Sequence, residues 1–184
     1  MAGLASLVAP GGTGRFYTSE RMAMGEAIKV TVRRASSGDA AEAALLLRRS
    51  IVELCAADHR GEPALVSGWI ENKTEENVLR WIGDPAGAVF VAEVGGKLAG
   101  VGMVRTDGEV LLNYVHPEAR FRGVSGALMD ALEAEARAAG RGVCRLESTA
   151  TARRFYERRG YVASGGCGSR CDGRLSCDWM EKRL

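Results

Sequence analysis

A nine-residue stretch in the second half of the chain, residues 120–128, has the composition of an anion-binding turn. It reads RFRGVSGAL, with Gly123 placed where a turn would open into a helix. The first amides of a helix have no intrahelical acceptors, and the helix dipole places partial positive charge at the same end. Backbone N–H groups arranged in this way can hold phosphate oxygens. The stretch therefore predicts a site that fits a diphosphate.

Two flanking elements would hold this turn in place. The apolar run VLLNYV, residues 110–115, precedes the turn and is typical of a strand, whereas apolar residues recur at helical spacing after it. The helix should end near Gly140. Its expected buried positions are Val124, Leu128, Ala131, Leu132 and Ala136.

Length and composition indicate one globular domain with a single core. The chain has 184 residues, of which 46% are hydrophobic and 26% charged. A net charge of +2 gives no support for a nucleic-acid partner. The alternative is a nucleic-acid-binding module that uses the basic cluster RRFYERR. Such a module would bind DNA in a strongly salt-dependent manner. No apolar run approaches the ~20 residues that cross a bilayer, so we expect no membrane partner.

The first 26 residues are rich in Gly, Ala, Ser and Thr and show no useful periodicity. We expect them to be disordered, with the folded domain occupying residues 27–184. Their apolar run, residues 4–9, is shorter than a signal-peptide core and follows no positive segment. Export is therefore not expected, and the predicted location is the cytoplasm.

The five cysteines suggest neither a disulfide framework nor a metal site. Their number is odd, and Cys55 and Cys144 lie in apolar runs. Cys167, Cys171 and Cys177 have the spacing C-x3-C-x5-C, which could suggest zinc. The spacing lacks a C-x2-C pair and has no histidine nearby, so we expect reduced thiols and no metal.

Periodicity along the rest of the chain predicts alternating strands and helices. A strand begins at Ile28, and Ser36 with Asp39 resembles a capping box before a helix that ends near Ala57. Thr74 would cap a shorter helix that Asp84 and Pro85 end. The remaining expected elements are strands at 88–94, 97–105 and 109–115, the helix after the turn, a strand at 143–147, a helix at 152–159 and strands at 161–163 and 176–184.

Two strings of the sequence resemble the acetyl-CoA-binding half of the GNAT superfamily of N-acyltransferases. They are YVHPEARFRGVSGALMDALE, residues 114–133, and ESTATARRFYERRGYVASG, residues 147–165. Arg120 and Gly123 match the family pattern R/Q-x-x-G-x-G/A, while Ser125 replaces its last small residue. The resemblance implies an α/β (α+β) fold with a central, mixed but mostly antiparallel, twisted sheet. This sheet would have six to seven strands, splay at the cofactor site and carry about four flanking helices.

The resemblance also implies acetyl-CoA as co-substrate and a set of cofactor-binding residues. Tyr114 and Val115 would offer backbone groups to the pantetheine arm, which would lie like an extra strand. The turn would hold the pyrophosphate. Its residues are Arg120, Phe121, Arg122, Gly123, Val124, Ser125 and Gly126.

Two side chains are candidates for the chemistry. The resemblance implies that Tyr156, in an A-x-x-F-Y helix, protonates the departing CoA thiolate; the alternative is a packing tyrosine. An attacking amine must be neutral, yet an alkylammonium has a pKa of ~10.4, so a base or a water relay is needed. Some protein-acetylating relatives place a basic carboxylate where Glu109 stands, although a solvated glutamate at a strand start is the alternative. Reserve candidates are Glu93, Glu147 and His116, and His59 could line the acceptor site.

The implied reaction is direct transfer of the acetyl group to a primary amine of a small molecule, peptide or protein in a ternary complex. Residues 37–81 and 164–177 would wall the acceptor cleft. Carboxylates at Glu53, Asp58, Glu62 and Glu71 could attract a cationic amine, although they also suit a solvated helix face. The alternative function is a CoA-binding sensor without turnover, in which Tyr156 and Glu109 are incidental. The resemblance also admits a homodimer.

Overall fold

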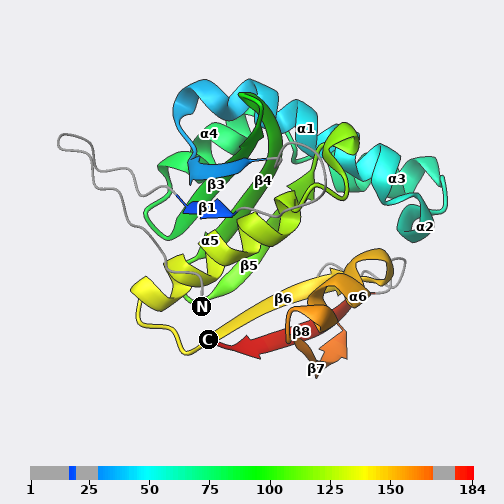
Figure 1. Cartoon of the computed structure of the whole chain (residues 1–184). Helices are drawn as coiled ribbons and strands as arrows, with labels where there is room; N and C mark the ends of the chain where they lie inside the picture. Colours follow the sequence, from blue (N-terminus) through cyan, green and yellow to red (C-terminus); the bar gives the residue numbers. More distant parts are fainter. Residues whose placement is uncertain (1–16, 20–28, 168–176) are drawn as a thin grey trace, which may run out of the picture.

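The computed structural model describes residues 17–19, 29–167 and 177–184. Within them the chain forms one eight-stranded sheet, in the order β1-β2-β3-β4-β5-β6-β8-β7, with six α-helices (Figure 1). The strands are β1 (Tyr17–Ser19), β2 (Val30–Arg34), β3 (Gly87–Val94), β4 (Lys97–Arg105), β5 (Glu109–Val115), β6 (Val143–Thr149), β7 (Val162–Cys167) and β8 (Cys177–Arg183). The helices are α1 (Ala40–Leu54), α2 (Ala56–His59), α3 (Pro63–Ile70), α4 (Glu75–Gly83), α5 (Val124–Ala138) and α6 (Ala150–Arg158).

The structure confirms the expected α/β fold with a mixed, mostly antiparallel sheet. The expected number of elements was too low, because the described residues form eight strands and six α-helices. Every described pairing is antiparallel except that of β5 with β6. The extra elements are the three-residue β1 and the short helices α2 and α3. Such short segments carry too little periodicity to be recognised, even though Pro63 starts α3 at a position that favours proline.

The N-terminal segment expected to be disordered falls mostly outside the described residues. Its described part, Tyr17–Ser19, forms β1 and pairs antiparallel with β2. None of the described helices combines the length and the apolar character that a bilayer-spanning segment needs.

Helices cover both faces of the N-terminal half of the sheet, which explains why β3 and β4 are apolar along nearly their whole length. Phe90 packs in the cluster formed with α5, whereas Val89 and Val91 pack in the cluster formed with α1 and α4. Gly100 in β4 lets α5 approach closely, because a Cβ there would lie 2.6 Å from Val124 Cγ1. The start of α5 is therefore seated directly on the sheet.

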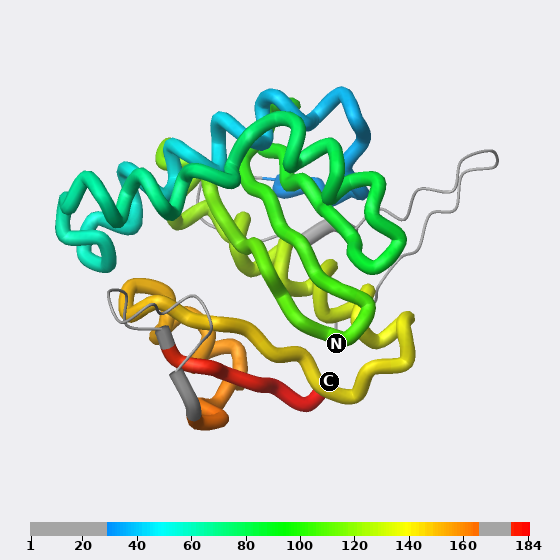
Figure 2. Tube along the Cα trace, turned by 180° about the vertical axis from the view of Figure 1, so that it is seen from behind, coloured from blue at the N-terminus to red at the C-terminus, as the bar shows by residue number. Residues whose placement is uncertain are grey.

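The sheet opens between β5 and β6. These strands pair only at Glu109 with Arg145 and at Val110 with Leu146, and beyond that point they diverge (Figures 1 and 2). β6 instead keeps an antiparallel partner, β8, from Val143 to Thr149. The register of β5 against β4 also shifts beside the opening, which leaves Leu111 as the extra residue of a bulge. The splay expected from the resemblance is thus a property of this chain.

Candidate active site

A cleft of about 1390 Å³ occupies the opening of the sheet. One wall comes from the C-terminal part of β5, the turn that follows, the start of α5, β6 and one side of α6. The opposite wall comes from α1, α3 and the segment that leads through α4 to β3. The C-terminal end of β4 and the N-terminal end of β5 complete this wall. Lining residues of this opposite wall include Ser50, Leu65, Trp69, Lys73, Trp81 and Arg105.

The turn before α5 presents backbone amides to this cleft. Phe121 and Gly123 have positive φ angles of 61° and 85°, and Gly123 is the N-cap of α5. The first hydrogen bond of the helix runs from the Ala127 N–H to the Gly123 carbonyl at 3.0 Å. The amides of Val124, Ser125 and Gly126 consequently have no intrahelical acceptors, as a phosphate cradle requires.

Eight of the nine residues expected to bind the cofactor line the cleft, and Arg122 is the exception. The lining set comprises Tyr114, Val115, Arg120, Phe121, Gly123, Val124, Ser125 and Gly126. Arg122 is exposed and does not line the cleft. The Tyr114 hydroxyl accepts a hydrogen bond from Trp69 Nε1 at 3.0 Å, which fixes α3 against β5.

Tyr156 lies in α6 with its side chain in the cleft wall and 7% of its surface exposed. Its ring packs edge-on against Phe155 and Tyr161, with centroid distances of 5.1 and 5.7 Å. Burial raises the pKa of the Tyr156 hydroxyl above its ordinary value, and a hydrogen bond from Asn113 partly opposes this. The hydroxyl is therefore protonated at neutral pH and can donate a proton.

Asn113 in β5 is a site residue that the sequence analysis missed. Its Nδ2 donates to the Tyr156 hydroxyl oxygen at 3.4 Å, while its Oδ1 is buried and has no hydrogen-bond partner among the described residues. A buried acceptor without a partner is costly, so the Oδ1 atom is suited to an N–H group of a ligand. The available signal was a polar residue inside the apolar run VLLNYV.

Glu109 is not brought together with Tyr156. It stands at the start of β5, does not line the cleft, and places its carboxylate 3.3 Å from Arg145 Nη2. The parallel pairing before the splay sets Glu109 opposite Arg145, which explains this ion pair. Glu147, two residues further along β6, does line the cleft.

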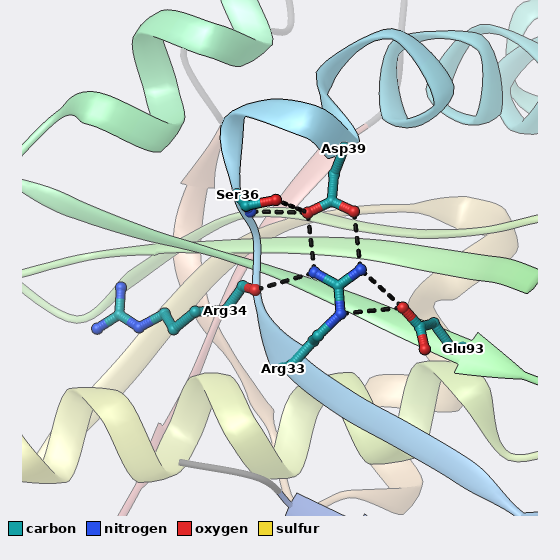
Figure 3. A network of polar contacts seen from close by, with 5 residues as sticks. All are labelled: Arg33, Arg34, Ser36, Asp39 and Glu93. Atoms are coloured by element: carbon teal, nitrogen blue, oxygen red, sulfur yellow. Dashed lines mark hydrogen bonds and ion pairs between the residues drawn. The ribbon is translucent and has the colours of Figure 1, made fainter. Parts of the chain in front are cut away.

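Glu93 belongs to a separate ionic cluster (Figure 3). Its Oε1 accepts from Arg33 Nη2 at 2.7 Å, and the same guanidinium holds both carboxylate oxygens of Asp39 at 2.8 Å. Arg33 lowers the pKa of Asp39 to about 2. Asp39 also accepts from the Ser36 N–H at 2.7 Å, as the expected capping box requires. Glu93 does not line the cleft. The ionic cluster instead joins β2, β3 and the start of α1.

The two histidines also lie outside the cleft lining. His59 is buried, with its Nε2 3.2 Å from the Ile51 carbonyl and its Nδ1 accepting from the Gly61 N–H at 3.1 Å. His116 lies 3.0 Å from Arg49 Nη1 and accepts from the Glu118 N–H at 3.3 Å. Both therefore serve local structure around the site.

None of the four carboxylates that could attract a cationic amine lines the cleft. Glu53 pairs with Arg49 at 2.8 Å, and Asp58 Oδ1 accepts from the Thr151 N–H at the start of α6 at 3.1 Å. Glu62 and Glu71 are exposed. Charged residues of both signs line the cleft instead, among them Lys73, Asp84, Arg105 and Glu147.

The two cysteines whose side chains the structure describes, Cys55 and Cys144, offer no nucleophile to this site. Cys55 lines the cleft, but burial raises the pKa of its thiol to about 12, so the thiol stays protonated. Cys144 is buried in the core. Cys171 and the side chains of Cys167 and Cys177 lie outside the described residues. Among the described residues, no three His, Cys, Asp or Glu side chains are grouped so as to hold a metal ion.

Comparison with known proteins agrees with this geometry. The family model described as "Acetyltransferase (GNAT) domain" matches residues 55–175. The chain belongs to the GNAT acetyltransferase family. A GCN5-related N-acetyltransferase from Rhodopseudomonas palustris is similar in structure to this GNAT chain, with a TM-score of 0.74 and 26% identity over 83% of this chain and 94% of that one.

Two further solved structures share the fold and contain the cofactor. The PaiA N-acetyltransferase of Thermoplasma acidophilum, in complex with coenzyme A, has a TM-score of 0.71 and 20% identity, covering 84% of this chain and 99% of its own. YncA from Salmonella typhimurium, a putative acetyltransferase with acetyl-CoA, has a TM-score of 0.64 and 20% identity, covering 84% and 94%. No curated protein sequence matches this GNAT chain significantly.

Proposed function

We propose that this GNAT protein transfers an acetyl group from acetyl-CoA directly to a primary amine in a ternary complex. The observation that carries the proposal is the cleft where β5 and β6 diverge, with the amides of the α5 N-terminus at one wall and the Tyr156 hydroxyl at another. A diphosphate fits the amides, and an extended pantetheine arm fits the unpaired edge of β5. The bound thioester supplies the acetyl group.

Tyr156 and Asn113 have different roles at the sulfur atom of CoA. Because Asn113 Nδ2 donates to the Tyr156 oxygen, the hydroxyl proton is directed away from Asn113 and is available to the thiolate. As the amine nitrogen bonds to the carbonyl carbon, the C–S bond breaks and its electron pair takes this proton. Asn113 is thus a positioning residue for Tyr156.

We propose Glu147, in place of Glu109, as the group that takes the proton of the attacking amine, directly or through water. Its carboxylate belongs to a residue of the cleft wall, whereas Glu109 is bound to Arg145 outside the lining. The high pKa of Cys55 speaks against a covalent acyl-enzyme at that residue, because a nucleophilic cysteine needs its thiolate form.

The proposal is tested by incubating the protein with acetyl-CoA and a mixed library of amines and peptides, following free thiol and product mass together. Release of CoA with a matching mass increase in an amine supports the transferase. Tight acetyl-CoA binding without turnover on any amine would support a CoA-binding sensor instead.

Replacing Tyr156 with phenylalanine should lower kcat about tenfold and leave the Kd for acetyl-CoA unchanged. The effect is smaller than that of a typical general acid because a thiolate, with a thiol pKa of ~8.5, is already a fair leaving group. Tyr161→Phe is the matched control, since this buried tyrosine lies outside the cleft lining. An equal loss in both variants, or none in Tyr156→Phe, would remove Tyr156 from the chemistry.

A further inference from the structure

Helix α6 carries Tyr156 but does not cap its own N-terminus. Its N-cap residue, Thr149, makes no side-chain capping hydrogen bond. An acceptor comes instead from a residue 93 positions earlier in the chain, because Asp58 Oδ1 in α2 accepts from the Thr151 N–H at 3.1 Å. A carboxylate at this place satisfies one of the first amides of the helix and lies at the positive end of its dipole. The start of α6 is therefore fixed by α2.

This contact spans the opening of the sheet at its wide end. β5 and β6 pair only near their N-terminal ends, at two residue pairs, and α6 begins directly after the C-terminal end of β6. At that end α2, which follows α1 on the opposite wall, reaches the start of α6 (Figures 1 and 2). The hydrogen bond from Thr151 to Asp58 therefore joins the two walls where the strands have diverged.

Asp58 is itself held in place on the α1 side. The next residue, His59, is buried, with its Nε2 3.2 Å from the Ile51 carbonyl of α1 and its Nδ1 accepting from the Gly61 N–H at 3.1 Å. Burial first, and the charge of Asp58 second, raise the pKa of the Cys55 thiol, so the carboxylate lies close to a residue of the cleft wall. Asp58 thus links the position of α6 to that of α1.

We propose that Asp58 is a positioning residue for acetyl transfer, which caps α6 from across the cleft and so holds the Tyr156 hydroxyl where it meets the CoA sulfur. The inference rests on the proposed role of Tyr156 in that transfer. Only about one and a half turns of helix separate Thr151 from Tyr156, so a shift at the start of α6 moves the hydroxyl. The hydrogen bond from Asn113 Nδ2 to this hydroxyl is long, at 3.4 Å, and fixes it only weakly.

The test is a double-mutant cycle in kcat between Asp58 and Tyr156, with acetyl-CoA and an acceptor from the amine library at saturation. Asp58→Ala should lower kcat about fivefold, because it releases the start of α6 and misplaces the hydroxyl. In the Tyr156→Phe background the same substitution should lower kcat by less than about twofold, since no hydroxyl is left to misplace. A merely structural role would give the same factor in both backgrounds.

Two controls separate positioning from stability. Asp58→Asn keeps an acceptor oxygen for the Thr151 N–H and should restore most of kcat. Thr74→Ala removes the hydroxyl that caps α4 by accepting from the Asn77 N–H at 3.2 Å. This variant should lower the urea midpoint about as much as Asp58→Ala does and leave kcat unchanged. In all of these variants the Kd for acetyl-CoA should stay within about twofold of the wild type, since the amides of α5 are untouched.

Hydrogen exchange at the Thr151 amide tests the cap in the wild type, without any substitution. Slow exchange supports it, whereas exchange at the rate of an unprotected amide would overturn it. If Asp58→Ala does not fold, the cycle is repeated with Asp58→Glu, which keeps the carboxylate but displaces α6 by one methylene and should show the same dependence on Tyr156.

Equal losses of kcat in both backgrounds, or no loss in Asp58→Ala, would overturn the inference and leave the proposed reaction standing. Wild-type kcat in Tyr156→Phe would remove the role of both residues. Failure of the proposed function itself would be distinct, because the wild type would then release no CoA with any amine while the Thr151 amide still exchanged slowly.

Discussion

Replacing Ser125 with glutamate should weaken acetyl-CoA binding about a hundredfold or more while leaving the fold intact. Ser125 is the second residue of α5, lines the cleft and contributes one of the amides without an intrahelical acceptor. A carboxylate at this position would face the diphosphate, and juxtaposed like charges cost several kcal/mol, at ~1.4 kcal/mol for each factor of ten. The same carboxylate favours the helix itself, because it lies at the positive end of the dipole.

The variant therefore separates binding from stability. Calorimetry with acetyl-CoA should show the loss, whereas urea denaturation should show a stability at or above that of the wild type. Ser125→Ala, which restores the small residue of the family pattern, is the control and should bind nearly as the wild type does. Wild-type affinity in Ser125→Glu would place the diphosphate elsewhere.

Replacing Glu133 with alanine should lower the free energy of unfolding by about 3 kcal/mol. Glu133 lies in α5 and is 3% exposed. Its carboxylate accepts from Lys182 Nζ at 2.7 Å, from the Tyr161 hydroxyl at 3.3 Å and from Arg159 Nη2 at 3.4 Å. These partners come from the C-terminal half, which is joined to β5 by two residue pairs alone within the described sheet. The variant would leave two largely buried cations without this carboxylate.

Asp130→Ala is the matched control for this prediction. Asp130 lies on the same helix and pairs with Arg159 at 2.6 Å, but its side chain is 58% exposed. Exposed ion pairs contribute ~0–1 kcal/mol, so this variant should stay close to the wild type in a urea titration. Equal losses in the two variants would mean that Glu133 does not join the two halves of the molecule.

The sequence predicted those parts of the site that depend on neighbouring residues. The turn at 120–128 could be recognised because Gly123 and the apolar positions after it are local signals, and the structure places Gly123 at the N-cap with a positive φ angle. Thr74 caps α4 as expected, its hydroxyl accepting from the Asn77 N–H at 3.2 Å. Tyr156 was identified from the resemblance of its A-x-x-F-Y string to the family, and the structure places it in the cleft wall.

The parts that depend on distant pairings could not be predicted. Asn113 meets Tyr156 only because α6 follows the strand next to β5, and Glu109 is bound to Arg145 by the register of β5 with β6. Lys73 lies in a turn after the unrecognised helix α3, where nothing local indicates burial. The burial of Lys73 therefore emerged only from the fold.

The most direct measurement follows the backbone amide signals of ¹⁵N-labelled protein during a titration with acetyl-CoA. The largest changes should occur at residues 121–126, which would bind the diphosphate, and at Tyr114 and Val115, beside the pantetheine arm. The amides of Glu93 and Asp39, in the ionic cluster away from the cleft lining, should barely move. Saturable changes confined to other parts of the molecule, or none at all, would contradict a cofactor held between β5 and β6.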